Sequence, residues 1–291
     1  MKITVAGATG NIGSAAAQAL LEAGHEVRVM VRQPAKVEAL VRQGAEAVVG
    51  ELEDADFVRR ATAGADGLFW LTPPQLAVPD VAAWQDQITA NAAAAIQANG
   101  VARVVHLSAL GAQMPQPRGF VHRFAITEKA LNLTGATTLN LRPGWFMENL
   151  LAQAGSIKDQ GKLYVAIGAD IPLPLISTVD IGRYAAQALT AAEAASGFVP
   201  LIGPDILTGH EIAARLSEVT GRPLEWVAVP PAALGDVFRG LGASEDAIRY
   251  FIELFEDFNR PDGPYGAPLP EAVRTPTTLE QFARPSLLPL L

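Results

Sequence analysis

Six short runs of apolar and β-branched residues alternate with segments of helical period in the first half of the sequence, and this alternation limits the fold more than any other feature. The runs are ITVAG (3–7), EVRVMVR (26–32), AEAVVG (45–50), GLFWLT (67–72), RVVHLS (103–108) and TTLNLR (137–142). Strand, helix and strand in succession predict a parallel sheet covered on both faces, because parallel strands need crossover connections. Glycines that favour left-handed helix caps punctuate the pattern at positions Gly24, Gly44, Gly64, Gly100 and Gly135. We therefore expect an α/β fold with a doubly wound parallel sheet.

The sequence GATGNIG directly follows the first predicted strand and opens the first predicted helix. In this context Gly7 permits a tight turn, Gly10 lets the backbone approach a pyrophosphate, and Gly13 lets helix and strand pack closely. The free N–H groups of the helix start favour a phosphate, and the side chains of Thr9 and Asn11 can add hydrogen bonds. The pattern predicts a Rossmann dinucleotide site; a glycine-rich turn without a ligand is the alternative. The residues assigned to it are Gly7, Thr9, Gly10, Asn11, Ile12 and Gly13.

The end of the second strand indicates which dinucleotide is preferred. About twenty residues beyond the fingerprint, NAD-selective sites place an acidic residue that binds the ribose 2′-hydroxyl. Arg32 holds that place, Gln33 follows it, and Lys36 comes one turn later. A guanidinium can pair with a 2′-phosphate. We therefore expect NADP(H) to be preferred over NAD(H), with a solvated charge at a strand end as the alternative for Arg32.

The pattern loosens after the sixth run. A helix at 179–189 and a strand at 198–203 continue the main layer, whereas the remaining segments predict shorter elements over the carboxyl edge of the sheet. Thr208 and the sequence TTLE (277–280) predict capped helices, the second ending at Pro285. The expected division is a Rossmann domain of residues 1–150 and 175–205 and a smaller, discontinuous α/β substrate subdomain of residues 151–174 and 206–291.

Composition and charge narrow the class of partner. The 291-residue chain has 22 Lys and Arg against 30 Asp and Glu, a net charge of −8, and no basic cluster of the kind that nucleic acid or an anionic membrane demands. It has no cysteine, which excludes disulfides and thiolate metal sites and suits a reducing cytoplasm. The N-terminal MKITVAG enters a strand at once, and no apolar run reaches membrane-spanning length. We expect a cytoplasmic protein with a small-molecule substrate, no nucleic acid, no membrane and no metal; monomer or homodimer is left open.

Several segments together resemble NmrA-like proteins, a family of atypical short-chain dehydrogenases/reductases. They are GATGNIG (7–13), VRQP (31–34), GELED (50–54), HLSALGA (106–112), LRPGWFMENLL (141–151), STVDIGRYAAQAL (177–189) and LTGHEIAARLSEVTGRPLEWVAVP (207–230). The resemblance implies that nicotinamide lies beyond the fourth to sixth strands and adenine near the third, in agreement with the rule that ligands bind at the carboxyl ends of parallel strands. The residues implied around the cofactor are Gly50, Glu51, Leu52, Leu71, Thr72, Pro73, Ser108, Phe124, Pro143, Gly144, Trp145 and Phe146, with ordinary strand-end packing as the alternative.

The segment RGFVHRFAITEKAL (118–131) follows the fifth strand, where short-chain reductases carry a Tyr and a Lys four residues apart. That spacing puts both on one helix face, where Tyr transfers a proton and Lys lowers its pKa. The matching positions here are Phe120 and Phe124, which can do neither. The resemblance therefore implies that the two rings wall the cleft for nicotinamide and substrate. The substrate pocket is expected to contain Phe120, Phe124, Trp145, Phe146, Met147 and Tyr164, with hydrophobic filling as the alternative for residues 145–147.

Among the histidines, His122 lies on the same predicted helix and is the candidate catalytic acid, with a non-catalytic histidine at the solvent edge as the alternative. His106 lies inside a buried strand and is expected to be structural. Without a Tyr and Lys pair, acceptors that need little protonation are favoured, namely a quinone, an imine or iminium ion, or an enone. We expect an NADPH-dependent oxidoreductase that transfers hydride to such a small apolar acceptor. A non-catalytic NADP(H)-binding redox sensor that acts through a protein partner is the alternative.

Overall fold

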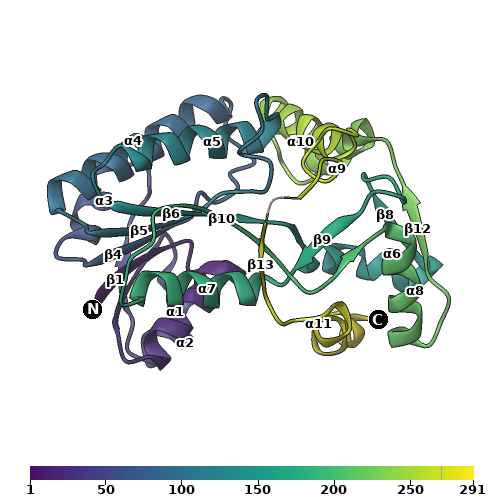
Figure 1. Ribbon diagram of the computed structural model, residues 1–291, viewed down its shortest axis with the longest axis horizontal. Helices are drawn as coiled ribbons and strands as arrows, with labels where there is room; N and C mark the ends of the chain where they lie inside the picture. Colours follow the sequence, from purple (N-terminus) through teal and green to yellow (C-terminus); the bar gives the residue numbers. More distant parts are fainter. Residues whose placement is uncertain (270) are drawn as a thin grey trace.

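The computed structural model describes residues 1–269 and 271–291 and contains an eight-stranded sheet (Figure 1). Its order is β13-β10-β6-β5-β4-β1-β2-β3, and every neighbouring pair is parallel. The strands are β1 (Lys2–Ala6), β2 (Glu26–Val31), β3 (Glu46–Val49), β4 (Gly67–Trp70), β5 (Arg103–Leu107), β6 (Thr137–Pro143), β10 (Gly197–Ile202) and β13 (Val273–Arg274). The six runs supply β1 to β6, and the five glycines expected at helix ends all have positive φ.

Helices cover both faces of this sheet, which confirms the doubly wound fold (Figure 1). One face carries α1 (Asn11–Glu22), α2 (Glu38–Arg42) and α7 (Thr178–Thr190), and the other carries α3 (Ala55–Thr62), α4 (Val81–Asn99) and α5 (Gly119–Asn132). No helix in residues 1–269 and 271–291 is long and apolar enough to cross a membrane.

The remaining elements gather at one end of the main sheet (Figure 1). A three-stranded sheet joins β7 (Trp145–Phe146), β9 (Leu173–Ile176) and β11 (Ile206–Leu207), and β8 (Lys162–Val165) pairs with β12 (Glu225–Ala228). The helices are α6 (Ala154–Gln160), α8 (Gly209–Thr220), α9 (Leu234–Gly240), α10 (Glu245–Phe258) and α11 (Leu279–Ser286), with 3₁₀ turns η2 (Met147–Gln153), η3 (Pro231–Ala233) and η4 (Leu288–Leu290). A further 3₁₀ turn, η1 (Pro34–Val37), lies elsewhere, directly before α2.

The chain after residue 206 departs from the predicted subdomain in two places. Strand β13 leaves the smaller part and pairs with β10 at the edge of the main sheet, and α10 lies beside α5 (Figure 1). The last helix also begins one residue later than expected, because Thr278 and Gln281 form its capping box. Pro285 lies inside that helix, so the prediction that it ends the helix was wrong.

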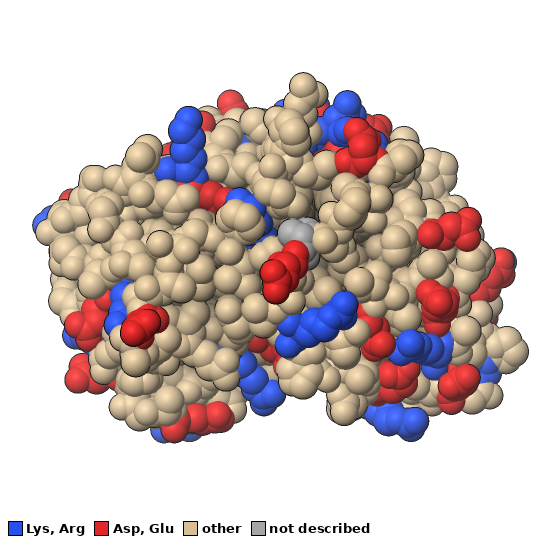
Figure 2. Space-filling view, viewed as in Figure 1, with Lys and Arg blue, Asp and Glu red and all other residues tan. Residues whose placement is uncertain are grey.

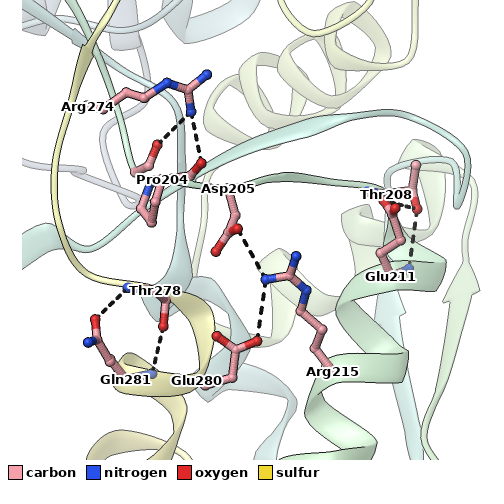
Figure 3. A network of polar contacts seen from close by, with 10 residues as sticks. Pro204, Asp205, Thr208, Glu211, Arg215, Arg274, Thr278, Glu280 and Gln281 are labelled. Atoms are coloured by element: carbon pink, nitrogen blue, oxygen red, sulfur yellow. Dashed lines mark hydrogen bonds and ion pairs between the residues drawn. The ribbon is translucent and has the colours of Figure 1, made fainter.

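A polar network ties the start of α8 to α11 (Figure 3). Thr208 caps α8 as predicted, and it forms a capping box with Glu211 that was not predicted. The Arg215 guanidinium then lies 3.2 Å from the Asp205 carboxylate and 3.4 Å from that of Glu280 in α11. Since these charges sit on three separate elements, the network holds the last helix against the smaller part of the molecule.

Helices α1 and α7 pack at close range, and Gly182 is the reason. A Cβ at Gly182 would lie 2.6 Å from the carbonyl oxygen of Ile12 and 2.7 Å from the backbone nitrogen of Ala16. The backbone of α7 therefore touches the backbone of α1 within its first two turns. This contact therefore fixes the start of α1, where the predicted phosphate-binding turn ends.

Toward the carboxyl ends of the central strands, the two faces of the sheet differ in polarity. Successive residues of a strand point to opposite faces, so each strand contributes to both. The face toward α1 and α7 carries Phe69, Leu71, Val105, Leu107, Leu139 and Leu141. The face toward α4 and α5 carries Trp70, Thr72, His106, Ser108, Asn140 and Arg142, called the polar layer below.

Within the polar layer, His106 is completely buried and its Nδ1 lies 3.0 Å from Asn140 Oδ1. The Asn140 amide nitrogen donates to Asn132 and to the carbonyl of Gly197, so its oxygen faces the imidazole and accepts from Nδ1. Burial lowers the pKa of His106 to about 4, although the Asn140 hydrogen bond and the nearby Glu128 carboxylate oppose this. The ring is therefore neutral at physiological pH, with its free lone pair on Nε2.

The contact between α1 and α7 predicts a large difference between two glycine substitutions. Gly182→Ala should lower the free energy of unfolding by about 1–3 kcal/mol, because the new methyl group overlaps backbone atoms of α1. Gly155→Ala in α6 meets no atom within 4 Å and should raise the free energy by roughly 0.5–1 kcal/mol through the unfolded chain. Urea unfolding of both variants measures the two effects. Equal stabilities would show that α7 can move away from α1 without cost.

The buried His106 also makes stability depend on pH. Its pKa is about 4 in the folded protein against 6.5 for the free group, so the unfolded chain binds more protons between these values and stability falls as the pH falls. Linkage gives a loss of about 2 kcal/mol from this group between about pH 7 and about pH 5. Urea unfolding at both pH values measures the loss, and His106→Gln should remove that share of it. The same loss in both proteins would contradict the assignment.

Candidate functional site

The glycine turn between β1 and α1 has the backbone geometry that a phosphate site requires. Gly7 has φ +73°, and the Gly10 N–H donates to its carbonyl oxygen at 3.0 Å. A Cβ at Gly13 would lie 2.3 Å from that same oxygen, so only glycine allows the helix to approach the strand this closely. A Cβ at Gly10 would meet nothing nearer than 3.6 Å, and Thr9, Gly10 and Asn11 are exposed. The turn is therefore closed toward the protein and open toward solvent at the start of α1.

A small pocket of about 80 Å³ lies beside this turn, at the carboxyl ends of β2, β3 and β4. Its lining residues are Gly7, Thr9, Met30, Val31, Arg32, Gly50, Leu52, Glu53, Phe57, Pro73, Gln75 and Trp84. The structure thus brings together predicted cofactor residues from four separate segments, including Arg32, whose side chain is exposed. Glu51 is exposed next to this pocket without lining it.

One wall of this pocket was not predicted from the sequence. The Trp84 indole on α4 donates to the Glu53 carboxylate, and Gln75 comes from the segment after β4. No motif spacing relates these residues to the glycine turn, because α4 reaches the pocket only through its packing on α3 and the sheet. Glu53 offers a hydrogen-bond acceptor at the side of the pocket that Gly50 and Leu52 form.

A larger groove of about 710 Å³ begins on the other side of the turn and runs along α1 between α7 and α11. Its wall includes Glu148, whose Oε1 accepts from the Thr178 N–H at 2.9 Å and from its hydroxyl at 2.6 Å. Ligands of doubly wound sheets bind outside the carboxyl ends of the strands. The small pocket meets this rule, whereas the larger groove follows the outer side of helices, so the small pocket is the candidate for the dinucleotide site.

The predicted nicotinamide residues lie at the ends of β4, β5 and β6. Leu71 packs under the turn, with its Cδ2 2.7 Å from where a Cβ of Gly7 would stand. The buried hydroxyls of Thr72 and Ser108 have no hydrogen-bond partner among the described residues. Pro143 and Gly144 are buried, and the Pro143 carbonyl accepts from the Leu110 N–H. Because unpaired buried hydroxyls are costly, the two at this edge fit a ligand that carries hydrogen-bonding groups.

Helix α5 carries the two phenylalanines that the resemblance places at the Tyr and Lys positions. Phe124, at the position expected for the Lys, is partly buried. Phe120 instead packs on α10, with its ring centroid 4.7 Å from that of Phe251 and 5.4 Å from that of Tyr250. His122 is exposed. The Phe120 ring thus packs on a helix that sequence spacing does not locate, and its place in the cleft wall stays a prediction.

Three further residues that were predicted for the substrate pocket make other contacts in the structure. Trp145 is 4% exposed and packs on Trp226 at 6.3 Å between ring centroids, and Met147 is fully buried in the same apolar cluster. The Tyr164 hydroxyl donates to Gln160 in α6 at 2.7 Å, away from the strand ends. For these residues the structure favours hydrophobic filling or local bonding over a pocket wall. Phe146 is partly buried against the core under α1 and α7.

Tyr265 is a buried tyrosine that was not among the residues predicted from the sequence. It stacks on Phe258 at 4.5 Å and is 5% exposed, and burial raises the pKa of its hydroxyl. Its loop lies against the segment after β5, since Pro264 Cγ is 2.7 Å from where a Cβ of Gly111 would stand. Buried Asp257 holds the loop, because its carboxylate binds the Arg118 N–H and the Arg260 guanidinium.

Charge is spread evenly over the face of the molecule drawn in Figure 2. Lysine and arginine side chains alternate there with aspartate and glutamate side chains, and neither sign forms a continuous patch on this face (Figure 2). This side of the protein therefore offers no extended basic surface for a polyanion.

Known proteins resemble this chain over most of its length. A family model described as NmrA-like family matches residues 1–283. The NAD(P)H azoreductase of Xenophilus azovorans is 31% identical over 253 residues, which cover 87% of this chain and 86% of that protein. Quinone oxidoreductase 2 of Escherichia coli is 26% identical over 242 residues, 82% of each chain.

The fold is also similar to that of solved reductases. The triphenylmethane reductase of Citrobacter sp., determined with NADP(H), superimposes with a TM-score of 0.82 at 20% identity, covering 99% of this chain and 100% of that one. The likeness extends beyond the parallel sheet to the smaller part of the molecule. Since the family model spans nearly all of the sequence and the azoreductase is related over most of its length, this chain belongs to the NmrA-like family of atypical short-chain dehydrogenases/reductases.

Proposed function

We propose that this protein is an NADPH-dependent reductase that transfers hydride to a small apolar acceptor, a quinone, an imine or iminium ion, or an enone. The observation that carries the proposal is the convergence of Gly7, Thr9, Arg32 and Leu52 on one pocket at the carboxyl ends of the strands. The relatives named as an NAD(P)H azoreductase and a quinone oxidoreductase support the same chemistry, because both names describe reduction of conjugated acceptors.

The residues of the site fit an NADP(H) molecule. The open side of the turn at Gly10 and the start of α1 would hold the pyrophosphate. The small pocket would take the adenosine end, with Arg32 at the 2′-phosphate and no acidic side chain following β2. The unpaired hydroxyls of Thr72 and Ser108 would serve the nicotinamide end. When bound, this cofactor supplies the hydride.

The acceptor class follows from what α5 lacks. Phe120 and Phe124 stand where related enzymes carry an acid and the lysine that tunes it, and a phenyl ring cannot donate a proton. An unactivated ketone develops alkoxide charge that needs such a donor. A quinone spreads the charge over its ring, and an iminium ion becomes neutral when it receives hydride. These acceptors therefore match the residues present.

Cofactor selectivity tests the assignment of Arg32. Arg32→Ala should raise the Kd for NADPH by about 10–100-fold, the value of a charged hydrogen-bonded contact of about 1.5–3 kcal/mol, and leave the Kd for NADH unchanged. Arg42→Ala removes another exposed arginine, in α2, and serves as the matched control. Fluorescence titration measures both constants. An unchanged ratio of the two Kd values in Arg32→Ala would exclude a 2′-phosphate contact.

Turnover tests the reaction itself. We expect the protein to oxidise NADPH steadily in the presence of at least one member of a panel of quinones, imines, azo dyes and enones, followed by loss of NADPH absorbance. Gly10→Val provides the control. A Cβ at Gly10 would have the Gly7 oxygen, 3.6 Å away, as its nearest protein atom, so the folded protein has room for it. It should fold normally and lose activity, since phosphate can no longer approach. Tight NADPH binding without turnover of any acceptor would instead support a redox sensor.

A further inference from the structure

The polar layer contains buried polar groups that the proposed site explains only in part, because it uses the Thr72 and Ser108 hydroxyls alone. Five of its polar atoms have no hydrogen-bond partner in residues 1–269 and 271–291: Trp70 Nε1, Thr72 Oγ1, His106 Nε2, Ser108 Oγ and Arg142 Nη1. They all lie on one face of three adjacent strands. Native proteins leave few buried polar groups unpaired, so such a concentration calls for a physical cause.

The strand register shows that these groups stand next to one another. Trp70 pairs with His106 and His106 with Asn140, which places the three residues abreast across β4, β5 and β6. Two residues further along the strands come Thr72, Ser108 and Arg142. The Ser108 N–H donates to the Leu141 carbonyl at 2.8 Å, which carries the same register to the strand ends.

The chemistry of the five atoms identifies what can satisfy them. Trp70 Nε1 and Arg142 Nη1 are donors only, whereas His106 Nε2 is an acceptor, because Nδ1 carries the ring proton toward Asn140. The two hydroxyls can do both. The remaining guanidinium nitrogens of Arg142 are bound to Glu128 at 2.6 and 2.9 Å. An ion of either sign would suit only part of this set, but water both donates and accepts and commonly pairs such groups.

We propose that ordered water in the polar layer relays a proton to the reduced acceptor, with Ser108 as the last donor and His106 as a positioning residue that holds the water. This proposal rests on the proposed function. Ser108 lies at the strand ends, where the acceptor is expected. At the other side of the layer, Asn140 is bonded to Asn132, which is exposed at the end of α5. This bond orients the Asn140 amide, which in turn orients His106.

The proton and electron balance can be written for a quinone. When bound, the cofactor would supply one hydride, which brings two electrons, and a quinone acceptor would become a hydroquinone monoanion. The anionic oxygen takes the Ser108 hydroxyl proton, and Ser108 regains a proton from the neighbouring water. That water is recharged from solvent at the strand ends, so each cycle consumes one NADPH and one solvent proton. His106 accepts a hydrogen bond at Nε2 and orients the water without changing its own charge.

Two variants of His106 separate this role from simple packing. His106→Asn keeps an amide at the position of Nδ1, next to Asn140, and removes the atom at Nε2, whereas His106→Gln restores a polar atom there. With NADPH and duroquinone, we expect His106→Asn to lower kcat by about tenfold, a modest part of what proton transfer contributes. The KM for NADPH should stay constant and the solvent deuterium isotope effect on kcat should increase. His106→Gln should recover most of both changes.

The matched control is Leu139→Val, which alters the neighbouring strand β6 on the opposite, apolar face. It should lower stability but leave kcat and the isotope effect at their wild-type values. Trp70→Phe gives an independent test if His106→Asn does not fold, because it removes one unpaired donor and keeps a large ring; we expect the same increase in the isotope effect.

Several outcomes would overturn the relay. These are an unchanged isotope effect in both His106→Asn and Trp70→Phe, equal losses in His106→Asn and His106→Gln, or a change in the KM for NADPH alone, which would assign the layer to cofactor binding. If the wild-type protein turns over no acceptor at all, the proposed function fails, and the relay fails with it. Normal turnover that none of these variants alters overturns the relay alone.

Discussion

The backbone contact between Gly13 and the carbonyl of Gly7 is the constraint on which the candidate site depends. It brings the first turn of α1 against the end of β1 at a distance that no side chain would permit. Gly182 allows a similar close approach between the backbones of α7 and α1, and this contact holds α7 on α1. Because both contacts are between backbone atoms, the start of α1 has little freedom to move, and its free N–H groups face the edge where all neighbouring strands end.

The two faces of the sheet below that edge carry different kinds of side chain. Its α1 and α7 face is filled with aliphatic and aromatic side chains, which stabilise the fold through burial. Its other face contains a neutral buried histidine and the Arg142–Glu128 ion pair, both less than a tenth exposed. Polar groups in such a position cost desolvation energy, and replacing them with apolar residues often stabilises a protein. Their presence beside the candidate site is consistent with a role in its chemistry.

The site residues divide according to how far their neighbours lie in the sequence. Gly7 to Gly13 and Arg32 could be assigned from their distance to β1 and β2, because turn chemistry and strand ends are local properties. Phe120 could not, because its ring packs on α10, more than a hundred residues later. The same reason explains Trp145, which Trp226 covers, and Tyr265, whose loop is held by Asp257 and Arg118. The residues of the polar layer could be read in the sequence, but their lack of hydrogen-bond partners could not.

By itself the sequence determined the parallel sheet, the order of its strands along the chain, the helix ends at glycine and the dinucleotide turn. Each of these follows from periodicity or backbone preference within a few residues. Tertiary structure alone decided that β13 returns to the main sheet, that α10 packs on the ring of Phe120, and that three strands align their unpaired polar atoms in one buried layer. These features depend on which surfaces meet after the chain has folded, and side-chain burial at a distance leaves no local pattern in the sequence.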